Sequence, residues 1–210
     1  MAFTGWPVEA FDVLARLEGD PSPSDREQVR PERERLVRAP MVQLLRELAE
    51  RDETYADHSV WRYATGIRWW QHQSSAIRID RNVEIGVGFS LDGLRVQGAW
   101  WYGSAEQRER YRAAVADRPG VELQRIVDRL QTRSFEISGD LLVRVPRGYP
   151  ADHPRATLLR HRSLIAVRQL GVGPWLHDER ALDRLETTAA ELRPLLEWLC
   201  DHVADVPIEP

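Results

Sequence analysis

The sequence contains no lysine, so all 29 of its basic residues are arginine. Without lysine there is no side-chain amine to form a Schiff base with a carbonyl substrate. There is also no lysine for a phosphate-binding P-loop or for the ATP site of a protein kinase. These three classes of enzyme are therefore excluded. Arginine stays charged, and its planar guanidinium group suits bidentate contacts with carboxylates and phosphates.

Cysteine is nearly absent as well, since Cys200 is the only one. An internal disulfide is impossible, and no cysteine spacing for zinc or an iron–sulfur cluster exists. The six histidines form no HExxH pair, and no GxSxG segment supplies a nucleophilic serine. We therefore predict no metal site and no cofactor.

Long apolar runs are also missing. The sequence does not begin with a basic segment followed by an apolar stretch, and no later stretch is long enough to span a bilayer. We expect a soluble, cytoplasmic protein that does not act at a membrane. A length of 210 residues, 42% of them hydrophobic and 30% charged, favours a single domain over residues 1–210 with its core at about 7–203.

Apolar residues at helical spacing predict helices at both ends and in the middle of the chain. Pro40 should kink or split the second of them. The expected helices cover residues 7–17, a segment from a cap at Ser24 or Asp25 to about Arg51, 104–117, a segment from Pro119 to about Leu130, 153–161 and 178–203.

Alternating apolar residues predict strands. Asp92-Gly93 lies between the alternating runs 83–89 and 94–100, and this is the strongest short-range signal for a hairpin. A second hairpin is expected to turn through Gly139-Asp140. The remaining predicted strands are 60–67, 75–80, 135–137, 141–145 and 163–170. The order of elements indicates an α+β fold: a mainly antiparallel sheet built from hairpins, flanked by N-terminal, middle and C-terminal helices.

Arginines and aromatic residues interleave between Trp61 and His72. Such a mixture can hold a nucleotide or single-stranded nucleic acid by stacking and phosphate contact. It is also typical of a half-buried sheet edge whose arginines pair with acidic residues. A net charge of −4 and a sequence pI near 5.9 argue against a dedicated nucleic-acid binder.

Two further motifs have structural as well as chemical interpretations. Gly86 and Gly88 lack the third glycine and the following helix of a dinucleotide-binding loop, so they predict close packing on one face of a strand. Asp152-His153-Pro154 is either an acid/base pair or the start of a helix, with a capping carboxylate and a proline in the first turn.

The C-terminal half resembles a known family. Residues 143–154 read Val-Arg-Val-Pro-Arg-Gly-Tyr-Pro-Ala-Asp-His-Pro, and Arg162-Ser163 follows. This order is similar to that of the bacterial and fungal family called domain of unknown function 2461, and the resemblance extends over roughly residues 7–203. It implies a divergent member, in which only Arg62 and Arg68 match the family's central arginine-containing stretch. It implies the α+β fold and no particular activity.

The leading hypothesis is a module that binds a small anionic, phosphate-bearing ligand, because arginines beside aromatic residues and a helix N-terminus suit an anion. The predicted ligand-binding residues are Arg62, Arg68, Arg147, Arg162 and Trp69. One alternative is a hydrolase that uses Asp152 and His153 as acid and base. Another is a protein-interaction module, for which the anchor would be an exposed tryptophan among Trp69, Trp70, Trp100 and Trp101. No oligomeric state is predicted.

Overall fold

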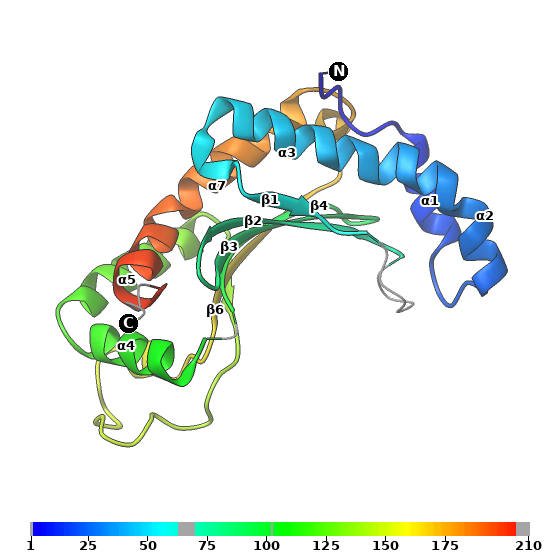
Figure 1. Cartoon of the computed structure of the whole chain (residues 1–210). Helices are drawn as coiled ribbons and strands as arrows, with labels where there is room; N and C mark the ends of the chain where they lie inside the picture. The colour runs from blue at the N-terminus through cyan, green and yellow to red at the C-terminus, as the bar shows by residue number, and fades with distance from the viewer. Residues whose placement is uncertain (1, 63–69, 102, 205–210) are drawn as a thin grey trace, which may run out of the picture. The chain divides into compact units, whose positions relative to one another are not determined.

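The computed structural model describes residues 2–62, 70–101 and 103–204, whose helices and strands are shown in Figure 1. The chain divides into two compact units, and each is described by itself below. Unit 1 consists of Met1–Ile77, Gly86–Val96 and Gln169–Thr188; unit 2 consists of Arg78–Ile85, Gln97–Arg168 and Ala189–Pro210. The single domain expected from the chain length stays a prediction.

Within the described residues, six strands form one sheet in the order β1-β2-β3-β4-β6-β5. The strands are β1 (His58–Val60), β2 (Gln73–Asp80), β3 (Val83–Ser90), β4 (Gly93–Trp100), β5 (Glu136–Ser138) and β6 (Leu164–Gly171). β1 is antiparallel to β2, and β5 is antiparallel to β6. An antiparallel sheet with flanking helices confirms the predicted α+β class.

The helices of unit 1 follow the predicted pattern. They are α1 (Glu9–Arg16), α2 (Pro23–Arg33), the π-helical turn η1 (Glu34–Arg38), α3 (Ala39–Arg51), the 3-10 turns η2 (Glu53–Tyr55) and η4 (Pro174–His177), and the first residues of α7 (Arg180–Leu199). Ser22 and Asp25 form a capping box at the start of α2, so the cap lies slightly earlier than predicted. The chain stays helical from α2 through η1 into α3, so Pro40 does not split it; the proline lies in the first turn of α3, directly after the π-helical turn η1.

The core of unit 1 is built around Trp6. Its ring stacks on Phe89 of β3 with a centroid separation of 4.5 Å, and its indole N–H donates to the carbonyl of Val37 at 3.0 Å. The turn after β3 needs glycine at position 93, where φ is +87° and a Cβ atom would overlap the carbonyl of Gly171. The hairpin predicted at Asp92-Gly93 is therefore confirmed.

Unit 2 contains the middle helices and most of the last one. They are α4 (Ala105–Ala116), α5 (Pro119–Thr132), α6 (Ala156–Leu159), the remainder of α7 and the π-helical turn η5 (Cys200–Ala204). Ser104 caps α4 in a capping box with Gln107. Trp100 stacks on Tyr111 at 5.0 Å in the core. In the part of the chain that the structure describes, no helix is long and apolar enough to cross a membrane.

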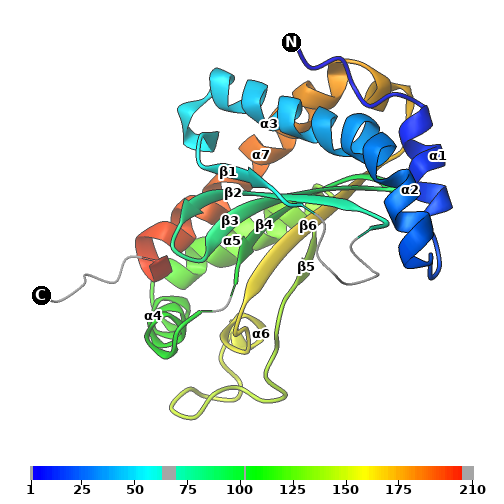
Figure 2. The same cartoon turned by 45° about the vertical axis from the view of Figure 1, so that its right-hand side comes forward.

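The hairpin predicted at 135–145 is wrong. β5 pairs with β6 instead, through partners such as Ile137 and Ala166, and Leu141 makes only an isolated bridge to His161. The segment after Gly139 lies at the surface, where Val143 is 89% exposed. Its apolar alternation therefore does not reflect a buried face, whereas β6 offers a longer strand for pairing (Figure 2).

Candidate functional sites

A pocket of about 530 Å³ lies in unit 2, and we call it the Arg162 pocket. Its residues come from the end of β4, the start of α4, the loop after β5 and the start of β6. They are Trp101, Gly103, Arg108, Gly139, Asp140, Arg162, Ser163 and Ile165. Arg162 is one of the predicted ligand-binding residues.

Trp101 and Ile165 supply the large apolar side chains of this pocket. Trp101 directly follows β4, and Ile165 belongs to β6, its neighbour in the sheet. The backbone N–H of Trp101 donates to the carbonyl of Asn82 at 2.9 Å. This hydrogen bond ties Trp101 to the turn between β2 and β3.

The charged side chains of the Arg162 pocket are Arg108, Arg162 and Asp140. Arg108 donates from Nη1 to the carbonyl of Gly103 at 2.9 Å. Arg162 Nη2 lies 2.6 Å from Asp140 Oδ2, and the backbone N–H of Asp140 donates to Ser163 Oγ at 2.8 Å. Two arginines and one aspartate give the lining a net charge of +1. An anion in this pocket would meet two guanidinium groups.

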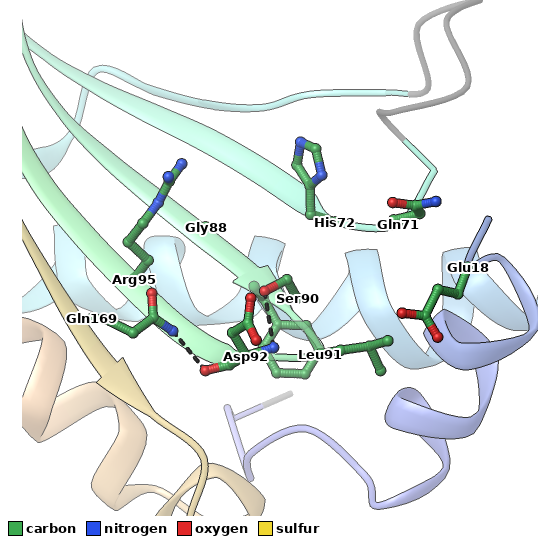
Figure 3. A pocket seen from close by; sticks show the side chains of 10 residues that line it. Glu18, Gln71, His72, Gly88, Ser90, Leu91, Asp92, Arg95 and Gln169 are labelled. Carbon is green, nitrogen blue, oxygen red and sulfur yellow. Dashed lines mark hydrogen bonds between the residues drawn. The ribbon is translucent and has the colours of Figure 1, made fainter. Parts of the chain in front are cut away.

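A second pocket, of about 340 Å³, lies in unit 1, and we call it the Arg95 pocket (Figure 3). The residues that line it are mostly polar: Glu18, Gln71, His72, Gly88, Phe89, Ser90, Leu91, Asp92, Arg95 and Gln169. Figure 3 shows Arg95 and Glu18 on opposite sides, with Ser90 and Asp92 between them.

Arg95 and His72 form the basic side of this pocket. A Cβ atom on Gly88 would lie 3.7 Å from Arg95 Nε, so the arginine side chain runs directly over this glycine. The pKa of His72 is lowered mainly by burial, and the charges of Arg95 and Arg33 lower it further. Because the ordinary value is already 6.5, the His72 imidazole is neutral at pH 7.

Arg33, at the end of α2, holds the backbone that carries His72. It is 1% exposed, donates from Nε to the carbonyl of Trp70 at 2.9 Å and from Nη2 to the carbonyl of His72 at 2.7 Å. Its Nη1 donates to Gln73 Oε1 at 3.2 Å. A buried guanidinium group therefore fixes the start of β2 beneath the pocket.

The predicted ligand-binding residues are distributed over both units. Arg162 lines a pocket. Arg62, in unit 1, and Arg147, in unit 2, are exposed and line neither of the two pockets. Arg68 and Trp69 lie outside the described residues. Among the predicted residues that the structure describes, Arg162 lines one of these two pockets.

Asp152 and His153 line neither pocket. His153 Nδ1 accepts from the backbone N–H of Arg155 at 3.0 Å, and its Nε2 lies 3.3 Å from the carbonyl of Ala116, to which it donates. The predicted cap at Asp152 is wrong, since α6 begins at Ala156 and its N-cap residue has no side-chain capping bond. His153, rather than the carboxylate, takes up a free N–H in this turn.

The burial of the tryptophans tests the prediction that one of them anchors a protein partner. Trp70 and Trp100 are 6% and 0% exposed, so neither can anchor a protein partner by an exposed ring. Trp101 is partly exposed and lines the Arg162 pocket.

Sequence reasoning missed Arg95 and Arg108. Arg95 lies between Leu94 and Val96, and the period of two places it on the face opposite these buried residues. That signal was available. Arg108 meets Arg162 in one pocket only through tertiary structure, so no local pattern could have paired them.

The fold and the two pockets define an α+β protein with candidate binding sites. Among the described residues, no group of three or more His, Cys, Asp or Glu side chains could hold a metal ion. The family described as "Conserved hypothetical protein (DUF2461)" matches residues 28–198, and the chain belongs to this family. No curated protein and no solved structure matches the chain.

Proposed function

We propose that this protein binds a small anionic ligand in the Arg162 pocket, through Arg108 and Arg162. The observation that carries the proposal is that two guanidinium groups line one pocket together with the partly exposed ring of Trp101. Guanidinium groups bind carboxylates and phosphates by charge-assisted hydrogen bonds, and an indole ring stacks on planar groups. The ligand class is therefore an aromatic ring that bears a phosphate or a carboxylate, as in a nucleoside monophosphate.

The ion pair between Arg162 and Asp140 does not oppose such a ligand strongly. Both side chains are about half exposed, at 45% and 53%. Exposed ion pairs contribute about 0–1 kcal/mol. A ligand anion can therefore compete for Arg162, while Asp140 remains available to accept a hydrogen bond from the ligand.

The hydrolase hypothesis has less support. An acid/base histidine needs a nitrogen that faces the substrate. Both ring nitrogens of His153 are engaged with the backbone of Arg155 and Ala116.

Thermal unfolding with inorganic phosphate, nucleoside monophosphates and benzoate tests the proposal. A ligand at 100 times its Kd stabilises the native state by about 2.7 kcal/mol, which raises Tm by several degrees. We expect Arg108→Gln and Arg162→Gln each to weaken binding by roughly tenfold. Arg125→Gln, which replaces an exposed arginine on α5, is the matched control.

The unliganded Arg162→Gln variant should lose no more than about 1 kcal/mol of stability. Ligand binding that is unchanged in both pocket variants, or no shift with any ligand class, would contradict the proposed site.

A further inference from the structure

The Arg95 pocket presents groups of opposite charge on opposite sides. Arg95 and Glu18 lie on opposite sides of it, with Asp92 between them (Figure 3). Within the described ranges, none of these three side chains forms an ion pair. Each charge is therefore available to a ligand.

The basic side is suited to an oxyanion. Arg95 presents a planar guanidinium group above Gly88. The neutral imidazole of His72 lies close enough for the positive charge of Arg95 to lower its pKa. The buried charge of Arg33 adds to the positive potential at this side. Arg33 also holds the backbone of His72 by a hydrogen bond, which fixes the position of that residue at the pocket.

The acidic side is held by backbone contacts from glutamine side chains. Gln71 Nε2 donates to the carbonyl of Gly19, next to Glu18, at 2.9 Å. Gln169 Nε2 donates to the carbonyl of Asp92 at 2.6 Å. Backbone hydrogen bonds thus hold the two segments that carry the carboxylates of this pocket.

We infer that the Arg95 pocket binds a compact zwitterion of the amino-acid class, whose carboxylate lies at Arg95 and His72 and whose ammonium group lies at Glu18 and Asp92. A singly charged anion meets repulsion from the two carboxylates, and a singly charged cation meets repulsion from Arg95. A molecule with both charges gains at both sides, which makes it the preferred ligand. The volume of about 340 Å³ fits a small metabolite.

This site is independent of the proposed function, since it lies in unit 1 and shares no residue with the Arg162 pocket. Failure of one therefore leaves the other untouched.

The test is calorimetric titration of the full chain with ω-amino acids of increasing length, from glycine and β-alanine to 6-aminohexanoate. For each length, the matching unsubstituted carboxylate and the matching amine are titrated as well. We expect one length to bind best, and to bind at least about tenfold more tightly than either singly charged analogue.

Variants assign the two ends of the ligand. Arg95→Gln should reduce zwitterion binding to the level of the amine, and Glu18→Gln combined with Asp92→Asn should reduce it to the level of the carboxylate. Arg46→Gln and Glu50→Gln, both exposed on α3, are the matched controls and should bind as the wild type does. The inference is overturned if no zwitterion binds, or if a singly charged analogue binds as tightly.

Discussion

Arg33 and Arg162, each next to one of the two pockets, are used in opposite ways. In unit 1, Arg33 is buried beneath the Arg95 pocket and donates hydrogen bonds to the backbone carbonyls of Trp70 and His72. In unit 2, Arg162 lies at the surface of its pocket and pairs with Asp140, a side chain that is itself half exposed. A chain whose only strong cation is arginine must use it both as a structural donor and as a ligand group.

The difference shows which arginine substitutions should unfold the protein and which should only change binding. A buried guanidinium group leaves several acceptors unpaired when it is removed. When an exposed guanidinium group is removed, its former partners form hydrogen bonds with water instead. Unit 2 has structural donors too. Arg155 donates to the carbonyls of Val115 and Ala116 at 2.6 and 2.9 Å, and the buried hydroxyl of Tyr111 donates to the carbonyl of Leu158 at 3.1 Å.

Replacement of the buried arginine should have the largest effect on stability. Arg33→Met leaves the carbonyls of Trp70 and His72 without their donor, and each unpaired buried acceptor costs about 1–3 kcal/mol. We expect the free energy of unfolding to fall by about 3 kcal/mol, measured by urea denaturation. Arg46→Gln, on the exposed side of α3, should change it by less than about 0.5 kcal/mol. Equal effects of the two substitutions would remove the distinction between the two uses of arginine.

The corresponding substitution in unit 2 should have a smaller effect. Tyr111→Phe keeps the ring that stacks on Trp100 and deletes only the hydroxyl group. Burial raises the pKa of Tyr111, so the wild-type hydroxyl is a neutral donor at any physiological pH. We expect a loss of about 1–2 kcal/mol by urea denaturation. Tyr149→Phe is the control, and a loss for Tyr111→Phe that does not exceed the control would contradict a structural role.

Much of the fold could be predicted because local signals and tertiary packing agree. Ser104 and Pro119 begin the helices that they were expected to begin, and Asp92-Gly93 turns between two strands. The second hairpin failed because alternation in residues 141–145 looks like a strand although Val143 is exposed. Only knowledge of β6 as a competing partner could have corrected it.

The candidate sites were less predictable for the same reason. Arg162 was expected in a ligand site, and it does line a pocket, but its companions Arg108 and Trp101 come from other segments. In unit 1, the stretch that ends at His72 was suspected, whereas Arg95 comes from a different strand. Each pocket is lined by segments that are distant in sequence. Composition could therefore suggest that arginines bind a ligand, but it could not show which residues line the same pocket.

The smallest expected effect concerns His72 and tests whether the Arg95 pocket has a positive side. The folded-state pKa of His72 lies below its ordinary value of 6.5, so the unfolded chain takes up this proton at a higher pH than the folded chain does. Above pH 6.5 both states are neutral, and the stabilising contribution is fully present; as the pH falls from 6.5 towards the folded-state pKa, it is lost. The difference in unfolding free energy between wild type and His72→Gln should therefore shift against the wild type in this window. Urea denaturation from pH 8 to pH 5 measures it.

Arg95 supplies part of the lowering of this pKa, so the pH-dependent loss should be smaller when His72→Gln is compared in an Arg95→Gln background. His161, in unit 2, provides the contrast, because burial is the main cause that lowers its pKa and the nearby arginine is Arg160. The pH-dependent loss of stability due to His161 should be the same with and without Arg95→Gln. If the pH-dependent loss of stability due to His72 is also the same with and without Arg95→Gln, Arg95 does not lower the pKa of His72. The pocket would then have no positive side.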